Sequence, residues 1–340
     1  MGEGHSIGEM HPRGEMHPRG EIHPREEMHS MEKEHSMEEE HSMEEEHFIE
    51  EEHFIEEEHS IEEGHSVEKY RLLCKLVQKE QFGTEMTQQE KDAAVQTFLA
   101  ARSQPDEILQ YKKRMRVNPA EDCLYPDYYL PPCDGGRKLR LVQGYLPKTN
   151  LLYANHYEAE ILRLLVRFAP EHEAVKDMVR HTLERFRKTC FGNFCTQGEC
   201  VAAGICVLRL LASVRPVDEA WIDKLLGPLG ESFLAFGPGQ AASQKGIPLS
   251  YLLMAFTDID NEKTRSLLGQ KKEWLVQLLK RGWITGRLSN GKTSEGDTYN
   301  LLGKYIIRNA VCTLPEYPEK ERYRIYVDDA EGRCYCDIAG

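Results

Sequence analysis

The sequence predicts an all-α protein of stacked antiparallel helical hairpins, with a small C-terminal β-hairpin and a disordered N-terminal tail. One observation is an internal repeat. The stretch Pro170–Val179 returns 46 residues later as Pro216–Leu225, and the apolar run Ile161–Leu165 returns as Val207–Leu211. Repetition at a fixed offset of about 20–50 residues is typical of repeat architectures. The other is that apolar residues recur every three or four positions from Lys69 onward, which is the spacing of amphipathic helices.

The first 68 residues differ in composition from the rest. Histidine recurs every sixth residue from His5 to His65, and the segment has 23 Asp and Glu against 4 Lys and Arg. Its balance is −19 and that of the whole chain is −14, which leaves +5 for residues 69–340. The body is therefore close to neutral, and its charge gives no reason to expect nucleic acid as a partner.

We expect the tail to be disordered. On a helix, six residues advance about 240° beyond one full turn, so the single apolar position of each unit forms no continuous stripe. Few apolar residues and a high net charge are typical of disorder. A hexapeptide β-helix also has a six-residue period. It would stack the carboxylates of successive units on one another, which argues against this fold.

Imidazole at regular intervals is also a metal-ligand pattern, so the tail is expected to bind Zn²⁺ or Ni²⁺ adventitiously. The alternative is an expanded repeat that is tolerated because it is solvated. The candidate ligands are His29, His35, His41, His47, His53 and His59.

Other classes of protein find no support in the sequence. No apolar run follows a basic start, as a secretory signal requires, and no stretch reaches the roughly 18 apolar residues of a membrane span. Ten cysteines in 340 residues is not the density of a disulfide scaffold. A reducing cytoplasm is the expected location.

The chain beyond the tail is expected to have four parts: N-terminal helices at 69–116, a Pro/Gly/aromatic connection at 117–149, helical hairpins at 150–315 and a β-hairpin at 316–340. Thr87 and Glu90 have the spacing of a capping box. Within 150–315 the first helices of successive pairs start near residues 150, 199, 248 and 297, and Gly/aromatic connectors join the pairs. The expected helices are Leu151–Phe168 with Pro170–Lys188, Glu199–Ala212 with Val217–Leu226, Pro248–Phe256 with Asn261–Lys280, and Asp297–Cys312.

Residues 150–315 resemble the α/α toroids, the superfamily of terpenoid cyclases and protein prenyltransferase β-subunits. The resemblance rests on the helix spacing and on connectors that end in Gly198-Glu199 and Gly296-Asp297. It implies a toroid or partial toroid in which an inner ring of helices surrounds a cavity. It also implies that Glu199 and Asp297 lie at inner-helix N-termini, facing the mouth of that cavity.

The motifs of that superfamily are incomplete. The stretch from Asp258 to Asn261 lacks the last carboxylate of the cyclase Asp-x-Asp-Asp motif, and we interpret it as a turn and an N-cap. Asp297-Thr298-Tyr299 lacks the cysteine that accompanies the zinc-binding aspartate of prenyltransferases. A shared fold does not by itself confer an activity.

The candidate catalytic residues are Glu199, Asp297 and His156. His156 and Glu160 are four residues apart on one helix face, a geometry that suits acid–base work or metal binding. For His156 the alternative is an ordinary histidine on a polar helix surface. For Glu199 and Asp297 the alternative is helix capping.

The candidate metal ligands of the body are Cys190, Cys195 and Cys200. They would suit a soft metal if they converged, although their spacing lacks the close pair of a zinc knuckle. The alternative is a set of buried thiols. Cys206 falls in the apolar stripe of its helix and is expected in the core. Cys334-Tyr-Cys336 places two thiols on one face of a strand.

The function expected from these patterns is that of a helical-repeat binding or scaffold protein that holds a protein or peptide and carries a metal-capable tail. The alternative is a toroid enzyme acting on an apolar or polyprenyl-like substrate in a central cavity. We favour the first because no complete catalytic set is present in the sequence.

Overall fold

The computed structural model describes residues 67–104, 106, 108–109, 126–128, 133–134, 137–195, 198–237, 243–244, 247–280, 294–317, 323–328 and 333–338. The chain divides into the units Met1–Ile55 and Glu56–Gly340, and the described residues belong to the second. They are predominantly helical, which confirms the expected helical fold class. The tail, with its predicted disorder and its histidines, lies outside them. None of the described helices is both long and apolar enough to cross a membrane.

Four helices pack against each other in chain order and form an inner layer. They are α4 (Asn150–Phe168), α6 (Cys200–Ser213), α8 (Leu249–Ile259) and α11 (Ser294–Val311). α6 is enclosed on all sides, because every residue from Val201 to Leu211 is buried. The starts of these helices lie within three residues of the predicted positions.

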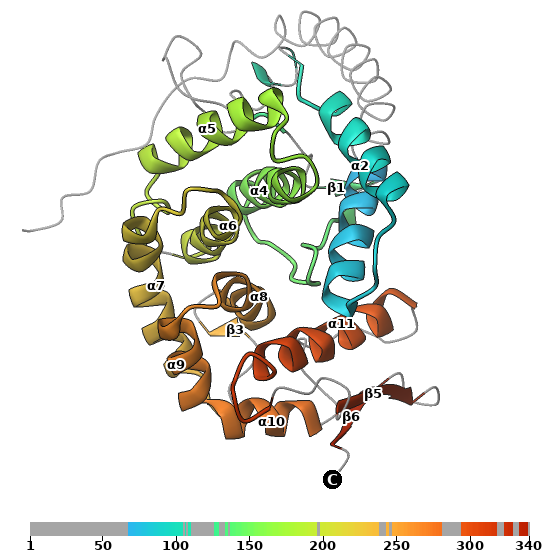
Figure 1. The fold of residues 1–340 in the computed structure, drawn as a ribbon, viewed down its shortest axis with the longest axis vertical. Coiled ribbons are helices and arrows are strands. Elements are labelled where there is room, and N and C mark those ends of the chain that lie inside the picture. The colour runs from blue at the N-terminus through green and yellow to red at the C-terminus, as the bar shows by residue number, and fades with distance from the viewer. Residues whose placement is uncertain are drawn as a thin grey trace, which may run out of the picture. The chain divides into compact units, whose positions relative to one another are not determined.

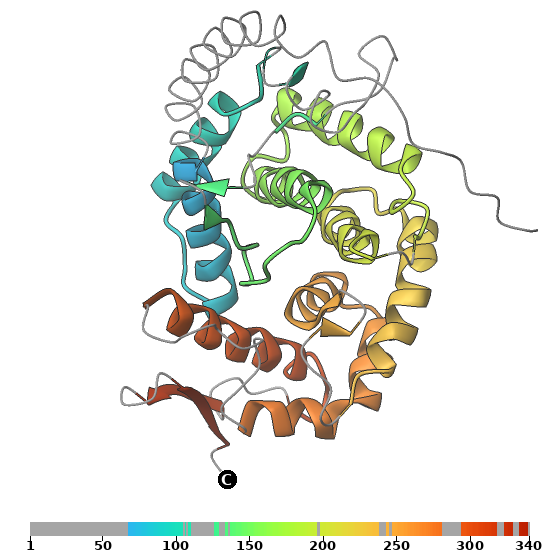
Figure 2. The ribbon, with the colours of Figure 1, turned by 180° about the vertical axis from the view of Figure 1, so that it is seen from behind.

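A second set of helices covers the outer side of the first (Figures 1 and 2). α5 (Glu173–Lys188) packs on α4, α7 (Glu219–Leu234) on α6, α9 (Glu262–Gln270) on α8, and α10 (Lys272–Lys280) on α11. The sequence of α5 explains its outer position. Its apolar residues form one stripe, which is buried against the body, while its other face is charged and exposed to solvent.

The helix over residues 67–82 joins both ends of the inner layer. Glu80 forms a bidentate ion pair with Arg163 of α4, at 2.6 and 2.9 Å. One residue on, the carbonyl of Gln81 accepts a hydrogen bond of 2.8 Å from Asn309 of α11. The contacts α4–α6–α8–α11 therefore return to α4 through the helix of residues 67–82.

The segment of residues 139–147 lies between these helices. Leu141 and Val142 have no exposed surface. The carbonyl of Arg140 accepts a hydrogen bond from Tyr70 of the helix over residues 67–82, and Gly144 is so close to Tyr299 of α11 that a Cβ would lie 2.8 Å from its ring. This part of the Pro/Gly/aromatic connection is therefore packed inside the body.

Near the start of the described residues, α2 (Gln88–Ala100) begins at the predicted capping box. Thr87 and Glu90 exchange both hydrogen bonds of that motif, and α2 packs on α4. Farther along the region in which N-terminal helices are expected (69–116), residues 106 and 108–109 are helical.

Two predictions about the outer helices are wrong. The helix expected at Val217–Leu226 continues to Leu234 as α7, through Pro228. Leu229 and Phe233 are buried in the core, and their burial outweighs the hydrogen bond that a proline removes from a helix. The helix expected at Asn261–Lys280 is divided at Lys271 into α9 and α10.

The described strands form antiparallel pairs. Two pairs are very short: β1 (Cys133–Asp134) with β2 (Arg137–Lys138), and β3 (Ser243–Gln244) with β4 (Ile247–Pro248). The third joins β5 (Tyr323–Asp328) to β6 (Arg333–Ile338), in the region where the sequence predicts a β-hairpin. The last pair packs on α11.

Candidate functional site

The interior of the helical body contains ion pairs. The carboxylate of Glu160 accepts hydrogen bonds from Arg163 at 3.0 Å and from Arg209 at 2.7 Å. Arg209 also donates to Asp258 at 2.7 Å, and Tyr251 donates to Glu160 at 2.8 Å. Burial alone would raise the pKa of Glu160, but the Arg209 and Arg163 guanidinium groups hold it at about 2. This carboxylate is therefore ionised and fully paired.

His156 lies beside this cluster with no exposed surface. Its ring centroid is 5.2 Å from that of Tyr251, and neither ring nitrogen has a hydrogen-bond partner among the described residues. Burial lowers the pKa of His156 to about 4, so the ring is neutral at pH 7. The alternative of an ordinary histidine on a polar helix surface is wrong, because this face of α4 points into the body. His156 and Glu160 share one face, as predicted.

A second buried polar cluster was not anticipated from the sequence. Glu158 of α4 pairs with Arg185 of α5 and accepts a hydrogen bond of 3.1 Å from Thr182. Asp127 lies nearby and binds His181 at 2.8 Å. In the sequence, this cluster is indicated only by charged residues in α5. They occupy positions that belong to the apolar face of the helix by the 3.6-residue period.

Glu199 is a cap, but of a different helix from the expected one. It precedes α6 and is the N-cap residue there, yet its side chain makes no hydrogen bond to that helix. Instead its carboxylate accepts from the backbone N–H groups of Lys148 and Thr149, each at 2.7 Å, and from the hydroxyl of Tyr145 at 3.0 Å. The carboxylate therefore satisfies donors at the start of α4, about 50 residues earlier.

The remaining catalytic candidate, Asp297, is the fourth residue of α11 rather than the residue that precedes it. Its side chain lies outside the described residues. The expected turn and N-cap after α8 are present: Asp260 has a left-handed conformation, and Asn261 caps α9.

The three cysteine candidates come together. The Sγ atoms of Cys190, Cys195 and Cys200 all lie within 4.8 Å of one another, and those of Cys190 and Cys200 are 3.7 Å apart. None of the three forms a disulfide. Burial, and then the two neighbouring thiols, raise the pKa of Cys200 to about 12.

The turn between α5 and α6 fixes the positions of these cysteines. The N–H of Gly192 donates to the hydroxyl of Thr189, and the carbonyl of Gly192 accepts a hydrogen bond of 2.7 Å from the Trp221 indole of α7. A Cβ on Gly192 would lie 1.9 Å from the carbonyl oxygen of Phe186, so the turn requires glycine. Phe191, in the same turn, is buried.

Cys206, on the same helix as Cys200, has no exposed surface and donates to the carbonyl of Ala202. Its predicted place in the core is confirmed. Cys334 and Cys336 lie two residues apart in β6, opposite Val327 and Ile325 of β5. Their side chains are outside the described residues.

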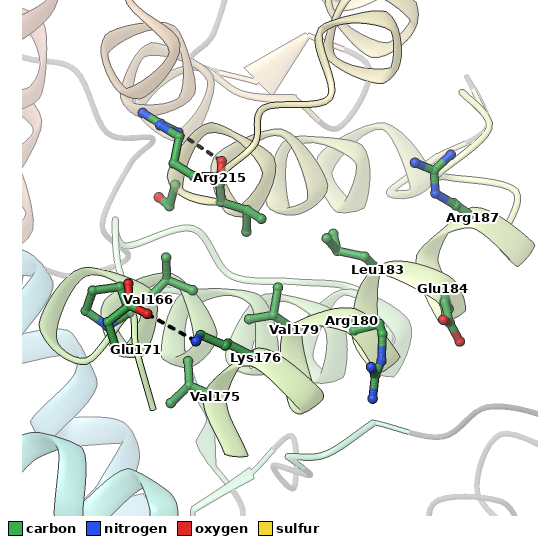
Figure 3. A pocket seen from close by; sticks show the side chains of 13 residues that line it. Val166, Glu171, Val175, Lys176, Val179, Arg180, Leu183, Glu184, Arg187 and Arg215 are labelled. Atoms are coloured by element: carbon green, nitrogen blue, oxygen red, sulfur yellow. Dashed lines mark hydrogen bonds and ion pairs between the residues drawn. The ribbon is translucent and has the colours of Figure 1, made fainter. Parts of the chain in front are cut away.

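A groove of about 700 Å³ runs along α5 (Figure 3). Its other wall is the C-terminal part of α4 and the segment Ser213–Arg215 that follows α6. The apolar residues that line it are Val166, Pro170, Val175, Val179, Leu183 and Val214, and the charged ones are Glu171, Lys176, Arg180, Glu184, Arg187 and Arg215. The groove thus combines an apolar lining with four cations and two carboxylates.

Comparison of the chain with models of known protein families, with curated proteins and with solved structures gives no match.

Proposed function

We propose that this chain is a helical-repeat binding protein that holds a short peptide segment, with apolar and acidic side chains, in the groove along α5. The observation that carries the proposal is the composition of that groove, in which cations outnumber carboxylates around an apolar lining. Apolar pockets with a few polar groups at their edge are the usual form of binding sites.

Arg215 and Lys176 are the cations of the groove most open to an incoming carboxylate, since Arg180 pairs with Asp177 and Arg187 with Asp218. Arg215 is exposed and donates to the backbone carbonyls of Ala212 and Val214, and no carboxylate pairs with it among the described residues. Lys176 pairs with Glu171 and Glu173 at the surface. Exposed pairs of this kind contribute about 0–1 kcal/mol, so a ligand can replace them at little cost.

The charged interior supports binding over catalysis on an apolar substrate. In the proposed toroid, α4, α6, α8 and α11 are the inner helices, and the helix of residues 67–82 completes the ring. Glu160, Arg163 and Arg209 then occupy the centre, where a polyprenyl-like chain would need an apolar cavity. Desolvated charges are stable only with their partners in place, which disfavours displacement by such a substrate.

The test is fluorescence polarisation with the full chain and a labelled peptide that carries two leucines one helical turn apart, flanked by glutamates. A matched peptide has lysines in place of the glutamates. We expect the acidic peptide to bind and Arg215→Glu to weaken its binding by about fivefold or more, which corresponds to about 1 kcal/mol. Added salt should weaken binding as well.

Lys75→Glu is the matched control. Lys75 is an exposed cation on the helix of residues 67–82, away from the lining of the groove, so binding should be unchanged. Equal binding of the acidic and basic peptides, or an equal loss in both variants, would contradict the proposal.

A toroid enzyme remains a second candidate, for one specific reason. Gln143 and His156 are buried, and the polar atoms of both side chains lack partners among the described residues. Buried polar groups normally have a partner, so these atoms are consistent with a polar ligand group in the interior. If farnesol at saturation leaves the thermal midpoint of the full chain unchanged, this candidate fails; a rise that His156→Phe abolishes would support it.

A further inference from the structure

We propose that Cys190, Cys195 and Cys200 form a binding site for one Zn²⁺ ion, with three thiolate ligands from the chain and a fourth position open to an external ligand. The site is separate from the groove and does not depend on the peptide-binding proposal. It rests on the positions of three sulfur atoms that come from two helix ends and the turn between them.

The distances between the sulfur atoms suit this ion. In tetrahedral zinc sites the Zn–S distance is about 2.3 Å, which places two ligand sulfurs about 3.8 Å apart. The Sγ atoms of Cys190 and Cys200 are 3.7 Å apart, and Cys195 completes a group whose members all lie within 4.8 Å. The longest separation thus exceeds the tetrahedral value by no more than about 1 Å, which a small side-chain rotation removes. A disulfide needs a much shorter S–S distance of about 2.05 Å.

The chain holds these sulfurs in place through backbone geometry. Cys200 is the first residue of α6, and Cys190 follows the C-cap residue of α5. The turn between them is tied to Thr189 and Trp221 through Gly192. A site whose ligands are positioned before the ion arrives requires little reorganisation on binding.

The ligand set identifies the class of metal. Thiolates favour soft or borderline cations such as Zn²⁺ over Mg²⁺ and Ca²⁺, which prefer oxygen. Among the described residues the group contains three cysteines and no carboxylate or imidazole. Three protein ligands leave the fourth tetrahedral position for water or another molecule. Because Cys190 is exposed, that molecule can arrive from solvent.

The experiment is a titration of the reduced full chain with Co²⁺, a spectroscopic substitute for Zn²⁺. Thiolate ligation gives an intense sulfur-to-cobalt charge-transfer band in the near ultraviolet, which imidazole ligation by tail histidines does not. We expect this band to saturate at one Co²⁺ per chain and Zn²⁺ to abolish it by displacement. Its absence from the reduced wild-type chain would overturn the proposal.

We expect metal binding to weaken by more than about 100-fold in each of the variants Cys190→Ser, Cys195→Ser and Cys200→Ser. Removal of a residue that only hydrogen-bonds to a metal ligand costs up to about 100-fold in affinity, so loss of a ligand itself should cost more. Cys206→Ala is the matched control, because this cysteine lies in α6 but in the core. It should lower stability and leave the band intact. Circular dichroism checks that each variant is still helical. Among helical variants, an unchanged band in any of the three serine variants would overturn the site. Loss of the band in Cys206→Ala would overturn it as well.

Discussion

Arg163 and Arg209 hold the same place in the two copies of the repeated apolar run, and both guanidinium groups bind one carboxylate, that of Glu160. Arg209 is 49 residues from Glu160 in one direction and 49 from Asp258 in the other. The three residues therefore lie at matching levels of α4, α6 and α8. The repeated run thus contains, besides its apolar residues, an arginine that in its second copy, Arg209, links α6 to both α4 and α8.

Arg209→Ala should lower the free energy of unfolding by about 3–5 kcal/mol, because it leaves Glu160 and Asp258 without a shared cation in the interior. The control is Arg180→Ala. Arg180 pairs with Asp177 at 2.7 Å, the same distance as Arg209 to Glu160, but at the surface. Its loss should cost less than about 1 kcal/mol. Urea unfolding of both variants measures the difference, and equal losses would contradict the importance of burial.

His156 should make stability depend on pH between about 6.5 and about 4. Its pKa is lowered from 6.5 to about 4 in the folded chain, so the unfolded state binds more protons in this range and stability falls as pH falls through it. The expected loss between pH 7 and pH 5 is about 2 kcal/mol.

His156→Phe should remove this part of the pH dependence, since the substitution leaves an apolar ring beside Tyr251. Urea unfolding at both pH values, for the wild type and the variant, measures it. His172 is exposed and serves as the control position, so His172→Phe should keep the wild-type pH dependence. An identical loss of stability in the wild type and in His156→Phe would show that other groups are responsible.

Glu199→Ala should lower stability by about 2–3 kcal/mol, because it removes a charged acceptor from backbone N–H groups at the start of α4. Amide hydrogen exchange should become faster at Lys148 and Thr149. Glu219, an exposed carboxylate in the first turn of α7, is the control, and Glu219→Ala should cost no more than about 1 kcal/mol. Unchanged exchange at both amides in Glu199→Ala would mean that the cap contributes nothing.

The helices of the body follow largely from local sequence. The spacing of apolar residues gave the starts of α4, α6, α8 and α11, and Thr87 with Glu90 gave the cap of α2. The boundaries that failed were decided by contacts far along the chain. The helix expected to end at Leu226 continues through Pro228, because burial of Phe233 beyond it favours continuation of α7.

Some features of the candidate sites also follow from local sequence, whereas others depend on contacts far along the chain. Sequence alone determined the cysteine-rich connector, the helix face shared by His156 and Glu160, and the arginine of each repeat, because these depend on short-range spacing. Tertiary structure alone decided that Cys190, Cys195 and Cys200 converge, that Glu199 caps α4, and that His156 is buried with no hydrogen-bond partner among the described residues. Each of these depends on the packing of helices that are distant in sequence. The spacing of residues within one helix does not determine which side chains of other helices come within a few ångströms of it.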